Sequence, residues 1–277
     1  MRIQTITSRD NALVKTIKRL AQSSGSYKEA GQVWLEGEHL CDAFLKAPVS
    51  QNFQLQKCFV SMSSKSHWME LIETYALKAT FDMACEVVML PDTLFDYISG
   101  LPSSGGVGFV LGLPKAAKAI DKTAHTLVLD RVQDAGNVGS MLRSAAAFGV
   151  GQVLALQGTA LLWSPKVLRA AMGAHFSLHL VEGLTTDDVN LDVPVLATHV
   201  YAGELLHVMQ HEKRLPYPCA WIMGHEGQGV CQALLDKASV RVKIEQMSEE
   251  SLNVAAAAAV CLYATATTRT AQPLLAA

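Results

Sequence analysis

The sequence predicts an α/β protein built from two domains, and three observations lead to that prediction. Half of the 277 residues are hydrophobic and 17% are charged, which is typical of a well-packed globular chain. In the C-terminal half, short apolar runs alternate with segments of helical spacing, the pattern of a largely parallel sheet covered on both faces. A stretch rich in glycine, proline and lysine, residues 102–122, separates this half from a smaller α/β region before it.

The smaller region contains helical and strand patterns in alternation. Apolar residues at helical spacing predict a helix over 10–22, and residues 34–47 read as a strand running into a helix. We expect further elements at 57–62 (strand), 67–79 (helix) and 107–113 (a buried strand that closes the domain).

The C-terminal region alternates more regularly. We expect strands at 125–130, 151–156, 175–182, 193–200 and 219–224, and helices at 138–148, 164–174 and 251–265. Ligands of such sheets bind beyond the carboxyl ends of the strands. The candidate loops therefore follow Asp130, Ala197, Met223 and Ile244.

Composition and charge exclude several classes of protein. The formal net charge of −2 provides no global basic field, so contact with nucleic acid requires a local patch. The six cysteines form no C-x-x-C pair, which argues against zinc and disulfide frameworks and favours a reducing compartment. Neither a signal peptide nor a membrane helix of about 20 apolar residues is recognisable. We therefore expect a cytoplasmic protein without a membrane partner.

The first candidate loop opens a helix that carries one arginine among alanines. In DAGNVGSMLRSAAAFG, Asn137 is placed to cap the helix, Gly136 and Gly139 permit a tight turn, and Arg143 follows six residues after Asn137. Neither G-x-G-x-x-G nor G-x-x-x-x-G-K-[ST] is present, so the phosphate-binding motifs are not met. Taken alone, the stretch favours a capped helix with a surface arginine.

Two later loops carry polar residues at comparable positions. MGHEGQG places Glu226 among three glycines after a buried strand, and an ordinary glycine turn is the alternative. In SEESLNVAAAAAV, Ser251 is placed to cap the last helix, with Asn253 in its first turn. That alanine-rich helix could also lie in the core or at a subunit interface.

The three loops, taken in order, resemble the SpoU-type RNA 2′-O-ribose methyltransferases of the SPOUT superfamily. DRVQDAGNVGSMLRSAAAFG resembles the first family motif, IMGHEGQG the second and SLNVAAAAAVCLYA the third, over about Thr126 to Tyr263. The resemblance implies a SPOUT fold with a deep trefoil knot at residues 119–277. It also implies that residues 1–118 form a ribosomal-protein-like RNA-binding domain. Its basic residues near the N-terminus would contact phosphates: Arg2, Arg9, Lys15, Lys18, Arg19 and Lys28.

The resemblance also implies a cofactor and roles for individual residues. The family binds S-adenosyl-L-methionine, which would lie near Gly224, Ile244 and Leu252, with Thr198 a weaker candidate. Arg143 would be the central catalytic residue, gripping a phosphate and favouring the developing alkoxide, because a guanidinium stays protonated and makes a poor base. The residues that would orient Arg143 and the ribose are Asn137, Glu226, Ser251 and Asn253.

Three departures from the family pattern concern the loops. Ala135 stands where proline is usual, and His225 where asparagine is common. Glu245, Gln246 and Met247 replace the usual proline-containing turn of the third motif, which alters the expected adenine cradle.

These observations favour a homodimeric methyltransferase acting on structured RNA, rRNA in preference to tRNA. An RNA-binding protein of the same fold with lost or weak turnover is the alternative, and the missing phosphate fingerprint disfavours a dinucleotide-dependent oxidoreductase. The histidine pairs His175/His179 and His207/His211 lack an evident third ligand, so no metal is expected.

Overall fold

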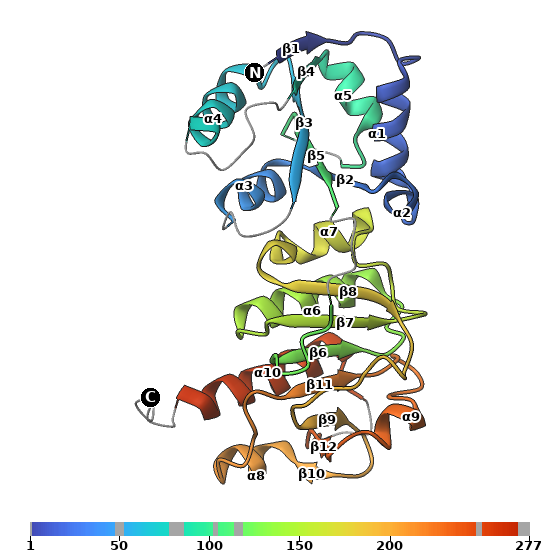
Figure 1. The fold of residues 1–277 in the computed structure, drawn as a ribbon, viewed down its shortest axis with the longest axis vertical. Coiled ribbons are helices and arrows are strands. Elements are labelled where there is room, and N and C mark those ends of the chain that lie inside the picture. Colours follow the sequence, from blue (N-terminus) through green and yellow to red (C-terminus); the bar gives the residue numbers. More distant parts are fainter. Residues whose placement is uncertain are drawn as a thin grey trace. The chain divides into compact units, whose positions relative to one another are not determined.

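The chain is described by a computed structural model that covers residues 2–47, 53–77, 86–101, 105–113, 119–247 and 251–270. Its contacts divide it into two compact units (Figure 1). The first comprises residues 1–117 with 163–176, and the second comprises 118–162 with 177–277. The expected boundary at 118/119 remains a prediction, and part of the connection at 102–122 lies outside the described residues.

The first unit is a mixed five-stranded sheet in the order β1-β4-β3-β5-β2. The described strands are β1 (Arg2–Thr5), β2 (Gln32–Glu36), β3 (Gln54–Ser61), β4 (Glu86–Leu90) and β5 (Val107–Gly112). The described helices are α1 (Ala12–Gln22), α2 (Ser26–Ala30), α3 (Glu38–Lys46), α4 (Lys65–Leu77), α5 (Asp92–Ile98) and α7 (Pro165–Ala171).

Helix α1 shows how the sequence builds this unit. Asn11 precedes it, and its Oδ1 accepts a hydrogen bond from the N–H of Leu13 (2.8 Å), which satisfies one of the free donors of the first turn. Val14, Ile17 and Leu20 recur at helical spacing and are buried. They pack with aromatic residues of the sheet, so the lysines and arginine of α1 remain on its outer face.

The second unit is a seven-stranded sheet in the order β10-β12-β9-β11-β6-β7-β8, and every neighbouring pair is parallel, as predicted. Its described strands are β6 (Thr126–Leu129), β7 (Gln152–Leu156), β8 (His179–Leu184), β9 (Val195–Thr198), β10 (Glu204–Leu205), β11 (Ala220–Met223) and β12 (Val240–Lys243). Its described helices are α6 (Ala135–Ala147), α8 (Leu206–His211), α9 (Gln232–Leu235) and α10 (Val254–Thr270).

Helices cover both faces of this sheet. Successive side chains of a strand point to opposite sides, so neighbouring residues of β11 contact different helices. On β11, Ile222 belongs to an apolar cluster with Leu234 and Leu235 of α9. The neighbouring Trp221 is fully buried, and its Nε1–H donates to Thr265 Oγ1 of α10 (3.0 Å). Helix α10 also packs against α6 (Figure 1).

The strand predicted over 175–182 is wrong in its first half. Ala174–Ser177 form a 3-10 turn, and the strand begins at His179. Met172 and Gly173 end α7 with positive φ angles (51° and 89°), and the N–H of Phe176 bonds back to Gly173 O (3.1 Å). Phe176 packs edge-on against Phe44 at 5.4 Å, so aromatic packing decides the conformation instead of the alternating pattern.

Two observations concern membrane association and the oxidation state of the cysteines. Among the described helices, none is long and apolar enough to cross a membrane. In the same ranges the cysteines are free thiols, namely Cys41, Cys58, Cys219, Cys231 and Cys261. Burial raises the pKa of Cys219 to about 12, so this thiol stays protonated near neutral pH.

Candidate active site

The candidate site lies where β6 and β11 end side by side. Leu129 pairs with Met223 in parallel register, so the loops that follow these strands emerge at the same edge of the sheet. The first loop leads through Asp130 to α6, and the second comprises Gly224–Gly229. The beginning of α10 reaches the same place, as its hydrogen bonds show.

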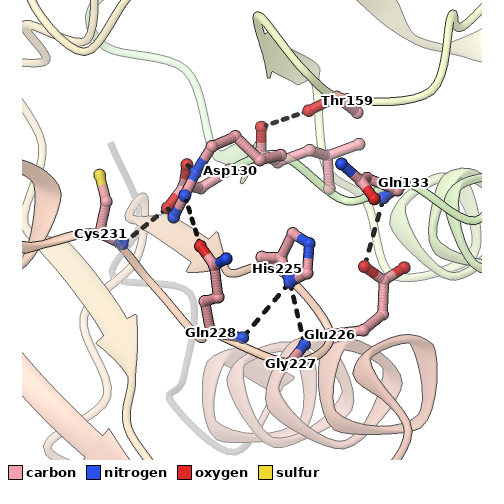
Figure 2. Close-up of polar contacts among 10 residues, drawn as sticks. Asp130, Gln133, Thr159, His225, Glu226, Gly227, Gln228 and Cys231 are labelled. Carbon is pink, nitrogen blue, oxygen red and sulfur yellow. Dashed lines mark hydrogen bonds and ion pairs between the residues drawn. The ribbon is translucent and has the colours of Figure 1, made fainter.

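Glu226 holds the first loop in position. Its carboxylate accepts hydrogen bonds from the backbone N–H groups of Gln133 (3.3 Å) and Asp134 (3.1 Å), and from Nδ2 of Asn137 (3.1 Å). Figure 2 shows the carboxylate facing Gln133. Burial opposes its ionisation, but its own backbone N–H, Asn137 and the two loop N–H groups outweigh this and lower the pKa of Glu226.

Asn137 links the loops instead of capping the helix. Helix α6 begins at Ala135, and Asp134 is its N-cap, with Oδ1 accepting from the N–H of Asn137 (2.7 Å). The predicted cap and the predicted start at Val138 are therefore wrong. The Asn137 side chain is left to donate to Glu226 and to accept from Nδ2 of Asn253 (2.9 Å).

Asn253, not Ser251, caps the last helix. Its Oδ1 accepts from the N–H groups of Ala255 (2.8 Å) and Ala256 (3.3 Å), while its Nδ2 donates to Asn137. Ser251 is exposed and makes no hydrogen bond to the described residues. Asn253, Asn137 and Glu226 thus form one continuous hydrogen-bonded chain, named here the amide–carboxylate chain, that joins all three loops.

The second loop is shaped by a close backbone approach and by His225. A Cβ on Gly224 would lie 2.1 Å from the N of Val230 and 2.2 Å from the C of Gly229, so only glycine fits there. His225 and Gly229 exchange backbone hydrogen bonds (3.1 and 2.8 Å). The Nδ1 of His225 accepts from the N–H groups of Gly227 (2.9 Å) and Gln228 (3.3 Å), so the imidazole closes the turn from within (Figure 2).

Arg143 is not part of the amide–carboxylate chain. It is exposed on α6, and no hydrogen bond or ion pair joins its guanidinium to the residues that the structure describes. The guanidinium is therefore available to an external anion.

The predicted cofactor residues come from three places in the second unit: Gly224 follows β11, Ile244 follows β12, and Leu252 precedes α10. Ile244, which follows β12, is half-buried, and Leu252 is 42% exposed. Thr198 ends β9, and its Oγ1 donates to Ile222 O (3.1 Å). In the altered third motif, Met247 is fully exposed and Glu245 lies 3.6 Å from His207 Nδ1. Residues 248–250 of this motif are outside the described residues.

Several residues of the site were not predicted from the sequence. Asp130 accepts from the N–H of Cys231 (2.7 Å), and Arg131 donates to Gln228 Oε1 (3.0 Å) (Figure 2). Asp134 supplies the helix cap. The one sequence signal was the position of Asp130 at the end of a buried strand. Among the described histidine, cysteine and acidic residues, no group of three is arranged to hold a metal ion.

The chain is an α/β protein in which three loops at the carboxyl edge of a parallel sheet bring the polar residues of the site together. Residues 124–263 match the model of the SpoU rRNA Methylase family, which covers about half of the chain and all three loops. The chain belongs to the SpoU rRNA methylase family.

Two relatives and one solved structure illustrate the similarity. The mitochondrial rRNA methyltransferase 3B of Danio rerio is 33% identical over 77% of this chain, which spans 49% of that protein. The 23S rRNA (guanosine(2553)-2′-O)-methyltransferase RlmP of Bacillus subtilis is 28% identical over 94% of this chain and 98% of its own length. The AdoMet-bound rRNA methyltransferase of Sinorhizobium meliloti has the same fold, with a TM-score of 0.78, 22% identity and 99% coverage of both chains.

The lowered pKa of Glu226 makes a pH-dependent prediction. Because the folded-state pKa lies below the unfolded value of about 4.3, the ionised carboxylate stabilises the fold above that pH, and this contribution is lost as pH falls through the folded pKa. We expect the difference in unfolding free energy between wild type and Glu226→Gln to shrink as pH is lowered from about 5 to 3. Urea unfolding at several pH values measures it, and a constant difference would contradict the prediction.

Proposed function

We propose that this protein transfers a methyl group from S-adenosyl-L-methionine to a ribose 2′-hydroxyl of structured RNA. The observation that carries the proposal is the amide–carboxylate chain, which joins the three motif loops through Asn253, Asn137 and Glu226. Family membership and the 2′-O activity named for the Bacillus subtilis relative support the reaction class. By the same analogy, rRNA is the proposed substrate in preference to tRNA.

The residues at the sheet edge fit the proposed cofactor. A side chain at Gly224 would collide with the backbone of Gly229 and Val230, so the loop requires glycine at this position. Leu252 is an exposed apolar side chain and Ile244 is half-buried, so an adenine ring could cover both. When bound, the cofactor supplies an activated methyl group, and the protein has to align the hydroxyl that accepts it.

Arg143 is the proposed catalytic residue. It lies six residues after Asn137, about 9 Å along the helix at 1.5 Å per residue, and helical side chains lean back toward the N-terminus. A free guanidinium could bind an RNA phosphate beside the reacting ribose and favour the developing alkoxide. Ser251 and Asn253 are proposed to orient the ribose, while Asn137 and Glu226 hold the loop that precedes Arg143.

The first unit is proposed to bind RNA through one face of α1. Lys18 Nζ lies 3.4 Å from the ring centroid of Tyr97, and the guanidinium of Arg9 lies 4.6 Å from it. Two cations share one aromatic ring, and neither forms an ion pair within the described residues. Lys15 and Arg19 are already paired with Asp10 (3.0 Å) and Glu29 (3.7 Å). The pair on Tyr97 is therefore the part of the basic patch best suited to phosphate.

We also propose that the second unit contains a trefoil knot and that the protein acts in the cytoplasm. The knot is a property of the family's fold, and the reduced thiols of the described cysteines suit a reducing compartment.

Replacing Arg143 tests the catalytic assignment. We expect Arg143→Ala to lower kcat about 10²- to 10³-fold, the usual effect of losing an oxyanion-stabilising donor, while cofactor binding by calorimetry stays near wild type. Methyl incorporation into rRNA and tRNA is measured with labelled cofactor, and resistance to alkaline cleavage identifies 2′-O products. Arg214→Ala, which removes an exposed arginine paired with Glu204 and Glu212, is the control.

Three outcomes of that experiment separate the alternatives. Transfer to RNA that Arg143→Ala abolishes supports the proposal. Cofactor binding by wild type without transfer to any RNA favours an RNA-binding protein with lost turnover. Loss of both binding and transfer in Arg143→Ala contradicts the assignment of Arg143 to catalysis alone.

The pair on Tyr97 makes a separate prediction. The double substitution Arg9→Ala, Lys18→Ala should weaken RNA binding and reduce the slope of log affinity against log salt by about 1 to 2, the number of phosphate contacts removed. Lys46→Ala, which removes an exposed lysine of α3 that is paired with Asp42, is the matched control. An unchanged salt slope would exclude this face as an RNA contact.

A homodimer through the C-terminal domain is also proposed, because α10 leaves Val260 (42%) and Tyr263 (54%) exposed, and Tyr263 packs against Phe148. We expect sedimentation velocity to show a dimer and Val260→Asp to shift it toward monomer. A wild-type monomer at micromolar concentration would rule this interface out.

A further inference from the structure

Asp130 is a buried carboxylate placed at the end of β6, immediately before the first loop. Its side chain is almost fully buried, with 1% of the residue exposed. Oδ1 accepts from Arg131 Nε (2.8 Å), and Oδ2 accepts from Arg131 Nη2 (3.2 Å) and from the backbone N–H of Cys231 (2.7 Å). A buried charge is tolerated when it is paired and hydrogen-bonded in this way.

Arg131 is held in an unusual backbone conformation. Its φ angle is 57°, in the left-handed region that residues with a Cβ rarely adopt. Gly158 passes beside it, and a Cβ on that glycine would lie 3.2 Å from Arg131 Cγ. Such a conformation persists only where surrounding contacts maintain it, and Arg131 makes a two-pronged contact with Asp130.

The same guanidinium reaches the second loop. Arg131 Nη1 donates to Gln228 Oε1 (3.0 Å), while Asp130 binds the N–H of Cys231, just beyond the loop (Figure 2). Glu226 precedes both of these points in the sequence. Its carboxylate accepts from the N–H groups of Gln133 and Asp134, in the first loop. The end of the Gly224–Gly229 loop and Cys231 beyond it are therefore attached to the chain after β6.

We propose that Asp130 and Arg131 are positioning residues for methyl transfer, which hold the Gly224–Gly229 loop where Glu226 and Asn137 meet. The inference rests on the proposed methyltransferase function and deepens it. Neither residue needs to touch RNA or cofactor. Arginine is required because a planar fork can bind both carboxylate oxygens and still present Nη1 to Gln228, whereas the ammonium of lysine is a single point charge.

Steady-state kinetics of Arg131→Lys, Gln228→Leu and the double variant test the proposal. We expect each single substitution to lower kcat about ten- to hundredfold, since small misplacements of reacting groups cost that much, with KM for RNA within a factor of two of wild type. The double variant should be no worse than the more impaired single variant, because both remove the same contact. Arg214→Ala is the surface-arginine control and should match wild type.

Cofactor-binding stoichiometry and thermal melting separate positioning from loss of fold. The proposal predicts full stoichiometry with reduced kcat per site, and a kcat loss that merely follows a falling stoichiometry overturns it. Wild-type kcat in Arg131→Lys, a rise in KM for RNA alone, or additive effects in the double variant also overturn it. Wild type inactive on every RNA would instead contradict the proposed function, so the two failures are distinguishable.

Discussion

The Glu226 carboxylate is the contact on which the rest of the site depends, because it is the only acceptor that three donors of the first loop share within the described residues. Two of these donors are backbone N–H groups that precede α6, where the helix dipole also favours a negative charge. Without the carboxylate, those N–H groups and the Asn137 amide would have only water as a hydrogen-bond acceptor. The α6 segment contains Gly136 and Gly139, which weaken a helix, so tertiary contacts have to stabilise its start.

The prediction that the loops after parallel strands lie together agrees with the structure. Polar residues that follow parallel strands must meet at one edge, and Asn137, Glu226 and Asn253 do form one hydrogen-bonded chain there. The predictions failed at the caps. Asp134 and Asn137 are both good capping residues, as are Ser251 and Asn253, and local sequence cannot decide between the members of each pair. Contacts from distant segments decide, since Glu226 engages Asn137 and Asn137 engages Asn253.

Asp130 and Arg131 could not be predicted for a related reason. An aspartate after a buried strand is visible in the sequence, but its partner Cys231 lies 101 residues further on, and the left-handed φ of Arg131 has no sequence signature. His225 differs again. Histidine stands where asparagine is common, and its Nδ1 acts as the hydrogen-bond acceptor of the turn. With Nδ1 accepting, the ring hydrogen belongs on Nε2.

The capping role of Asn253 has a consequence for how the protein is made. The amide–carboxylate chain takes its members from positions 137, 226 and 253, so its last member is also the last to be synthesised. A nascent chain can complete the seven-stranded sheet before α10 exists, but Asn137 then lacks the donor on its Oδ1. Assembly of the site is therefore coupled to docking of the final helix. A chain truncated before Asn253 would retain the sheet strands and lose the link among the three loops.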